Sequence, residues 1–260
     1  MEVIRNVYPR AGAETQPGAG ANQHGTVEEP TLVVNQKGRS QIVLAVEIDA
    51  LVAEAARANS VIEFVPQVGD FVAVDEPLFK LYGLAATIDE ENLRECVAFG
   101  SERTMEQDPM FSFRILADIA LKALSPAIND PTTAVLAMDQ IHRLLRLVGK
   151  RRLHDELVHD STGQVRLVLR TPNWDDFVHI AFTEIRACGA NNVQIARRMR
   201  AMLLNLIHSL PESRHAALKK QLDLLDRTLP DHYKLAEDLA LARVPDSQGL
   251  GGASGGRLPV

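Results

Sequence analysis

The two halves of the chain differ in the spacing of their apolar residues. From residue 31 to 83, β-branched segments such as TLVVN and SQIVLAVEI are separated by turn residues, which is typical of strands. One segment of this half, IDALVAEAARANS, places Leu51, Val52, Ala55 and Ala56 on one stripe and predicts a helical insert. From residue 84 to 242, most apolar residues recur every three or four positions, which indicates helices.

The helical half contains three amphipathic stripes, each of which should pack against a neighbouring helix in a small bundle. Ahead of them, VRLVLRT at 165–171 is an isolated strand candidate, expected to pair with the β-rich part or to lie at the junction of the two halves. The stripes consist of Phe177, Ile180, Ala181, Ile185 and Cys188; of Ile195, Met199, Met202, Leu203, Leu206, Ile207 and Leu210; and of Leu218, Leu222, Leu225 and Leu229.

The β-rich half also contains a phrase, VGDFVAVDEPLFKLYG, that is similar to half of a barrel-sandwich module of the biotinyl and lipoyl carriers. Those carriers present a lysine at a hairpin tip, whereas Lys37 lies in a different sequence context here and Lys80 lies inside a predicted strand. No cofactor is therefore predicted. The expected fold is α+β, with a small β-rich, barrel-sandwich-like module at 31–83 followed by a mainly α-helical bundle domain at 84–242.

Both ends of the chain are predicted to be flexible. The stretch PRAGAETQPGAGANQHGTVEEP is rich in Gly, Ala and Pro, so residues 1–30 are interpreted as an N-terminal linker. The end of the chain, PDSQGLGGASGGRLPV, has a similar composition, and residues 243–260 are expected to form a disordered tail.

Composition narrows the classes of function. The net charge of −6 disfavours a nucleic-acid binder, which normally has a basic excess. Two cysteines, Cys96 and Cys188, are too few for a site of paired thiolates and indicate free, buried thiols in a reducing compartment. His154 and His159 are five residues apart, whereas metalloprotease helices space two histidines by four. No metal site is therefore predicted.

The segment between residues 101 and 134 contains the most distinctive polar residues. Asp108-Pro109 and Asp130-Pro131 each precede an apolar-periodic run and predict helix starts, and Ser125-Pro126 predicts the end of the first helix. On that first helix Arg114, Asp118 and Lys122 recur every four residues. The polar cluster comprises Glu102, Arg103, Thr104, Gln107, Asp108, Arg114, Asp118, Asn129, Asp130, Thr132 and Thr133.

Two interpretations of this polar cluster remain open. Its members can cap the two helices and fix the turn between them, with Asp118 half-buried against Arg114 or Arg103. Alternatively, they can form a pocket between the two helix starts, for an anion held by arginines or a cation held by carboxylates. Glu102, Thr104 and Asp118 can also be assembled into a catalytic set, but nothing in the spacing requires it, so no catalytic residue is assigned.

Two basic groups lie further along the chain. Lys150, Arg151 and Arg152 follow the helix that starts at Pro131, and Arg197, Arg198 and Arg200 cluster near the middle of another predicted helix. The plain interpretation of each is a solvated face. The alternative is contact with anionic lipid headgroups, to which each basic residue contributes about 1 kcal/mol.

Several strings of residues resemble one bacterial family. The chain contains ERT-x2-QD-x2-F from Glu102, then DIA-x-KALSP-x-INDPTTA from Asp118, and upstream GDFV-x3-EPLFKLYG from Gly69. These strings closely resemble the predicted membrane proteins of Domain of Unknown Function 2254, and the resemblance extends from about residue 31 to about Leu229. It implies a membrane protein whose transmembrane helices precede this part. No biochemical activity is implied by the family name.

The chain departs from this family in one respect. It contains no run of about 20 apolar residues, the length that a membrane span needs, and Glu2 follows Met1 without the apolar core of a signal peptide. Because MEVIRNVYP looks like the sequence after the last membrane helix of relatives, we expect a soluble remnant, from a truncated gene, a misplaced start codon or a cut segment. Such a domain is expected to face the cytoplasm.

The expected function is assembly, ligand sensing or regulation of a membrane part that is absent from this chain. The expected partners are that membrane part, the membrane surface or a second copy of the chain, and not nucleic acid. The alternative is an enzyme or transporter-gating domain that uses the polar cluster to handle a small molecule or ion.

Overall fold

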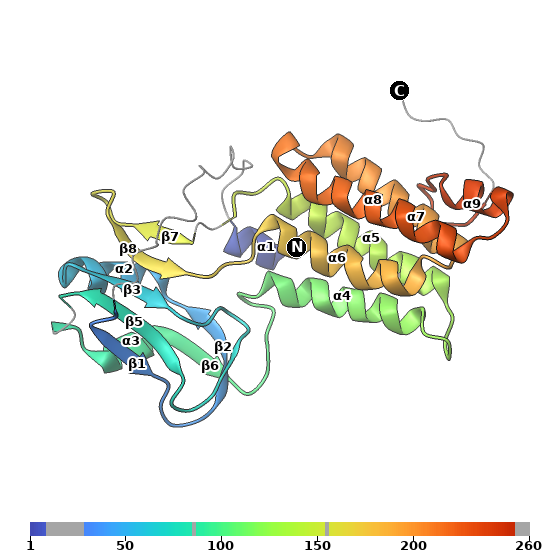
Figure 1. Ribbon diagram of the computed structural model, residues 1–260. Coiled ribbons are helices and arrows are strands. Elements are labelled where there is room, and N and C mark those ends of the chain that lie inside the picture. The colour runs from blue at the N-terminus through green and yellow to red at the C-terminus, as the bar shows by residue number, and fades with distance from the viewer. Residues whose placement is uncertain (9–28, 85–86, 154–155, 253–260) are drawn as a thin grey trace. The chain divides into compact units, whose positions relative to one another are not determined.

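The computed structural model describes residues 1–8, 29–84, 87–153 and 156–252. By its internal contacts the chain divides into two units. The helical unit contains Met1–Gln16, Ser112–Leu153 and Asn173–Val260, and the sheet unit contains Pro17–Phe111 and His154–Pro172. The elements of the two units confirm the α+β prediction (Figure 1).

The strands of the sheet unit form two sheets. The larger has the order β1 (Leu32–Asn35), β5 (Pro77–Gly83), β3 (Ser60–Phe64), β8 (Val165–Leu169) and β7 (Leu157–His159). Its neighbouring strands are antiparallel except for β3 and β8, which are parallel. The smaller sheet is antiparallel and has the order β4 (Phe71–Val72), β2 (Gln41–Val46) and β6 (Val97–Gly100).

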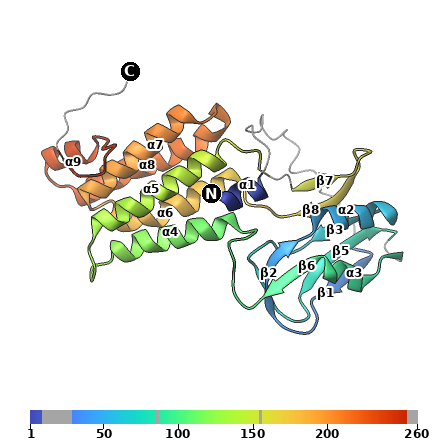
Figure 2. The same ribbon diagram turned by 180° about the vertical axis from the view of Figure 1, so that it is seen from behind.

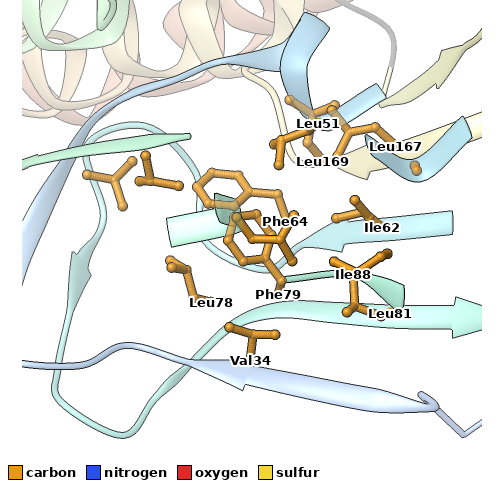
Figure 3. Packing of buried hydrophobic residues seen from close by; sticks show 14 of the residues in the cluster. Val34, Leu51, Ile62, Phe64, Leu78, Phe79, Leu81, Ile88, Leu167 and Leu169 are labelled. Carbon is orange, nitrogen blue, oxygen red and sulfur yellow. The ribbon is translucent and has the colours of Figure 1, made fainter. Parts of the chain in front are cut away.

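The core of the sheet unit contains residues of both sheets and of α2 (Ile48–Arg57), the predicted helical insert, which packs against β3 and β8. Ile62 and Phe64 of β3 and Leu167 and Leu169 of β8 are buried in this core. Leu51 of α2 packs against it (Figure 3). Phe64 of β3 is paired with Phe79 of β5, and their rings are in contact, tilted by 43° with the centroids 5.4 Å apart. Alternation of buried and half-buried residues therefore fixes the register of β3.

The sheet unit is larger than the module predicted at 31–83. It also contains α3 (Glu90–Glu95) and β6, because Leu93 and Val97 are buried in the same hydrophobic core. The strand predicted at 165–171 does pair with the β-rich part, as β8, but it is not isolated, since β7 pairs with it. Residues 84–111 and the β7–β8 hairpin were therefore wrongly placed in the helical domain.

Among its described residues the helical unit contains five longer helices. They are α4 (Pro109–Ala123), α5 (Pro131–Val148), α6 (Trp174–Gly189), α7 (Val193–Ser209) and α8 (His215–His232), with a short 3-10 turn, η2 (Glu212–Arg214), before α8 and a shorter helix, α9 (Ala236–Ala242), after it. The chain passes from the sheet unit to the helical unit within the first turn of α4. Helix α7 packs against α5, α8 and α9, and Figure 2 shows these helices from behind.

Most members of the predicted stripes are buried in the helical unit. Ile195, Met199, Met202 and Leu206 of α7 are buried, as are Leu218, Leu225 and Leu229 of α8. The stripe of α6 ends earlier than predicted, because Cys188 in its last turn is exposed. The expectation of two buried thiols is therefore wrong for Cys188, and Cys96 is only partly buried.

The first eight residues are folded, in contrast to the predicted linker. They contain α1 (Glu2–Val7), followed by Tyr8, and the side chains of Ile4 and Tyr8 are both 1% exposed. The ring of Tyr8 meets that of Phe177 of α6 edge-on, with the centroids 6.2 Å apart. Spacing by four places Ile4 and Tyr8 on one face, which packs on the helical unit. Residues 9–28, most of the predicted linker, lie outside the described residues.

Among the residues that the structure describes, no helix has both the length and the apolar character needed to cross a membrane.

Candidate functional site

Helix α4 separates the two halves of the predicted polar cluster. Asp108 precedes its first residue, whereas Asp130 follows the turn after its last. Fifteen helical residues rise by about 22 Å, so the two helix starts lie at opposite ends of α4. A single pocket between them is therefore not formed, and the cluster consists of three separate groups.

The first group is an ion pair between the buried Asp108 and Arg103, whose side chain is 38% exposed. Nη2 and Nε of Arg103 lie 2.7 and 3.0 Å from Oδ2 of Asp108, whose side chain is 5% exposed. Oδ1 of Asp108 accepts a hydrogen bond from the backbone N–H of Phe111, as the predicted cap requires. The guanidinium of Arg103 also lies over the ring of Phe111, 5.4 Å from its centroid. Both carboxylate oxygens of Asp108 are thus occupied.

A tight turn of the sheet unit supports this pair. Gly69 lies between β3 and β4 with φ +95°, and its N–H donates to the carbonyl of Val43. A Cβ added at Gly69 would overlap Nη2 of Arg103 and lie 2.6 Å from Oδ2 of Asp108. Only glycine combines this φ with such close approach. The GDFV and ERT-x2-QD strings therefore meet in space, a contact that sequence inspection did not reveal.

The second group joins α4 to α6. Arg114 donates from Nη1 to Oε1 of Glu184 at 2.8 Å and from Nη2 to Oδ1 of Asp118. The hydrogen bonds that Arg114 donates, first to Glu184 and then to Asp118, raise the pKa of Arg114. The two carboxylate side chains are 57% and 61% exposed. The expectation that Asp118 is half-buried is therefore wrong, and Glu184 is a partner of Arg114 that the sequence analysis missed.

The third group caps α5. Oδ1 of Asp130 accepts from the N–H of Thr133, and Oδ2 accepts from its hydroxyl at 2.5 Å. These bonds, with that from the hydroxyl first, lower the pKa of Asp130. Asn129 has φ +46° and donates its N–H to the carbonyl of Ser125, which closes the turn after α4. The predicted capping role of Asp130 is confirmed.

The other members of the polar cluster do not join these groups through their side chains. Among the described residues, none of them has a side-chain hydrogen bond or ion pair, and all except the half-buried Thr104 are exposed. They are Glu102, Thr104, Gln107, Asn129 and Thr132. The catalytic set of Glu102, Thr104 and Asp118 is therefore not brought together by hydrogen bonds.

The basic group on α7 is buried, which contradicts the solvated face predicted for it. Arg197, Arg198 and Arg200 are 0%, 8% and 9% exposed. Arg198 donates from Nε to Oδ1 of Asp139 on α5 at 2.8 Å, and Arg200 pairs with Asp226 on α8. The arginines are buried because α5, α8 and α9 surround α7 and because the chain end folds over Arg197.

Residues 245–252 are folded onto α7, in contrast to the disordered tail predicted for 243–260. Asp246 is 3% exposed, and its carboxylate accepts from the N–H groups of Gln248, Gly249 and Gly251. Despite burial, these bonds and the charge of Arg197 lower the pKa of Asp246. An Asp followed by glycines was the signal for this turn in the sequence. Residues 253–260 lie outside the described residues.

Within the described part of the chain, no three histidine, cysteine, aspartate or glutamate side chains gather in a way that could hold a metal ion. His154, considered in the sequence analysis, lies outside that part.

Comparison with known proteins agrees with the strings noted above. Residues 2–205 match the family described as "Predicted membrane protein (DUF2254)". Uncharacterized proteins of Mycobacterium tuberculosis and Mycobacterium bovis are 27% identical to the chain over 203 residues, which is 75% of this chain and 39% of theirs. The chain thus spans about two fifths of the length of these relatives. No solved structure matches it.

Proposed function

The chain belongs to the DUF2254 family of predicted membrane proteins, and we propose that it is a cytoplasm-facing, extramembranous part of such a protein that serves assembly or regulation. Its matched region corresponds to less than half of the curated relatives, so the activity of a whole relative can reside elsewhere in the sequence.

The proposal rests chiefly on how the carboxylates of the polar cluster are used. Asp108 is bonded by Arg103 and the N–H of Phe111, and Asp130 by Thr133. Arg114 pairs with Asp118 on its own helix and joins α4 to α6 through Glu184. A catalytic acid or base must be free to meet a substrate proton, whereas these groups hold helix starts and neighbouring helices in place. This use favours a scaffold or a regulatory element over an enzyme.

The distribution of charge supports a place beside a membrane. Residues 143–153 contain five Lys and Arg and no Asp or Glu. Nη2 of Arg214 donates to the carbonyl of Arg151, so the start of α8 lies beside this stretch and adds the exposed Lys219 and Lys220. Neither of these nor Lys150 forms an ion pair with a described carboxylate. The positive charges of these three lysines attract anionic headgroups within about 10 Å, the screening length at moderate salt.

Vesicle flotation tests this placement. The intact chain is mixed with vesicles of phosphatidylcholine alone or of equal parts phosphatidylcholine and phosphatidylglycerol. We expect binding only to the anionic vesicles, with loss at high salt. The triple variant Lys150→Gln, Lys219→Gln and Lys220→Gln should bind about 100-fold less, since each lysine contributes about fivefold. Its matched control carries Lys122→Gln, Arg227→Gln and Lys234→Gln, three exposed cations elsewhere on the helical unit.

Equal binding by the two variants, or equal binding to both kinds of vesicle, would contradict the membrane-surface part of this proposal. A thermal-shift screen with anions, divalent metals and nucleotides then tests whether the chain binds a small ligand. Stabilisation by a small ligand that is lost in Arg114→Ala would favour the alternative of a small-molecule or ion-handling domain.

A further inference from the structure

The C-terminal segment, defined here as Val244–Gly251, is held on α7 almost entirely through its main chain. Arg197 donates from Nε to the carbonyl of Val244 at 3.1 Å and from Nη1 to that of Gly251 at 3.2 Å. Arg198 donates from Nη1 to the carbonyl of Ser247 at 2.8 Å. A fourth carbonyl of the segment, that of Gly249, accepts a hydrogen bond from Nε2 of Gln194 at 2.6 Å. Side chains of α7 thus donate to four carbonyls of the segment.

The bound segment also has an ordered shape of its own. The carboxylate of Asp246 accepts three backbone N–H groups from the residues that follow it, and the N–H of Asp246 donates to the carbonyl of Arg197. Gly249 and Gly251 have φ +72° and +76°. A short peptide that folds around its own carboxylate loses less conformational entropy on binding than an unstructured one.

Gly249 makes the closest approach to the helices. A Cβ at this position would lie 2.6 Å from Cγ1 of Val135 on α5 and 3.1 Å from Cδ of Arg198. A side chain larger than hydrogen therefore cannot occupy this position unless the side chain of Val135 or of Arg198, or the segment itself, moves away. A peptide that binds here must therefore have glycine at the position of Gly249. At its other positions it is held mainly by its main chain.

The receiving face shows signs of a recognition surface. Gln194, Arg197 and Arg198 lie on one stretch of α7, and Nη2 of Arg197 has no hydrogen-bond partner among the described residues although the residue is fully buried. Burial of a charged donor without a partner is costly. These three residues lie inside the region matched by the family, residues 2–205, whereas the C-terminal segment lies outside it. The receiving face and its occupant therefore belong to different parts of the chain.

We propose that this face of α7 is a peptide-binding site, and that the C-terminal segment fills it as a detachable internal ligand. When the segment leaves, the guanidinium groups of Arg197 and Arg198 become available to the equivalent segment of a second copy of the chain. A tethered ligand competes at an effective concentration of about millimolar. The intact chain therefore masks the site from a free peptide.

The test uses the full chain and a labelled synthetic peptide with the sequence of residues 243–252. Fluorescence anisotropy should show weak binding to the unchanged protein. In Gly249→Val the added side chain meets Val135 and expels the internal segment, so the same peptide should bind at least about 100-fold more tightly. The control is Ser247→Ala. The side chain of Ser247 is exposed and only its carbonyl contacts α7, so this variant should bind the peptide as weakly as the unchanged protein.

Two further measurements make each outcome decisive. Adding Arg198→Met to Gly249→Val should abolish the gain in affinity for the peptide. The carbonyl of Ser247 in the peptide then has no guanidinium to donate to it. A peptide carrying Asp246→Ala should also fail to bind. If Gly249→Val unfolds the protein by circular dichroism, the segment is an integral part of the core and the proposal is wrong. It is equally wrong if the variant is folded but does not bind the peptide, or if the unchanged protein binds it as tightly.

Discussion

Arg103 shields the carboxylate of Asp108 almost completely from solvent, with Nη2 of the arginine 2.7 Å from Oδ2 of the aspartate. The pair is anchored at both ends, by the ring of Phe111 beneath the guanidinium and by the N–H of Phe111 on the carboxylate. Arg114 and Asp118, further along α4, form a pair whose carboxylate is 61% exposed. The two arginines should therefore differ in their effect on stability.

We expect Arg103→Ala to lower the free energy of unfolding by about 2 kcal/mol, because it removes both N–H groups that Arg103 donates to the buried carboxylate of Asp108. Arg114→Ala should cost less than about 1 kcal/mol, since both of its carboxylate partners are exposed. Urea titration followed by circular dichroism measures both values. If the two variants lost the same free energy of unfolding, the exposure of the carboxylate would not determine how much each ion pair stabilises the protein.

A second prediction concerns the turn at Gly69. Gly69→Ala should destabilise the protein by about 2 kcal/mol or more, because a positive φ is strained for alanine and its Cβ collides with the Arg103–Asp108 pair. Gly38 provides the matched control, with φ +82° and nothing within 4 Å of an added Cβ. Gly38→Ala should therefore show the backbone strain alone. Similar melting temperatures for the two variants would contradict the collision.

The pH dependence of stability should contain a contribution from Asp160. Hydrogen bonds from the hydroxyl of Thr162 and from Nε of Arg166 hold the pKa of Asp160 well below its ordinary value of 3.8. Because the folded-state pKa is the lower one, this stabilisation is complete above about pH 4 and is lost as the pH falls through the folded-state pKa. Asp160→Asn should be less stable than the unchanged protein at neutral pH.

That difference should shrink steadily in acid, because protonation removes the charge from the unchanged protein as well. Thermal melts of both proteins from neutral pH down to about pH 2 measure the trend. A difference that is constant over this range would mean that the charge of Asp160 does not contribute.

The two thiols should react at different rates. Cys188 is exposed, whereas burial, followed by the charges of Glu47 and Glu54, raises the pKa of Cys96. Alkylation proceeds through the thiolate. Iodoacetamide at slightly alkaline pH should therefore modify Cys188 well before Cys96, and mass spectrometry of Cys188→Ser should show only the slow site. Rapid modification of that variant would contradict the burial of Cys96.

Local signals in the sequence predicted the local parts of the structure. Asp108 and Asp130 were identified as caps because a cap depends on residues only three positions apart, and both bonds are present. The stripes on α7 and α8 were identified for the same reason. The alternative of one pocket between the two helix starts did not take into account the length of α4, which the spacing of the two prolines already implied.

Contacts between distant residues were not accessible in this way. The burial of Arg197 depends on carbonyls about 50 positions later, at Val244 and Gly251, and the glycine-rich composition there indicated disorder. Glu184 and Gly69 likewise gained their roles from residues far along the chain. A carbonyl accepts hydrogen bonds whatever its side chain is, so the sequence carries almost no trace of such contacts.

The parallel pairing of β3 with β8 has a consequence for synthesis on the ribosome. Phe64 at the end of β3 pairs with Leu169, so β3 keeps an unpaired edge until α4 and α5 have been translated. At about 5–20 residues per second, the hundred or so intervening residues take about 5–20 s. During that interval the nascent sheet offers an apolar, hydrogen-bonding edge to other chains. Translation speed and chaperone access between residues 65 and 169 should therefore govern the yield of folded protein.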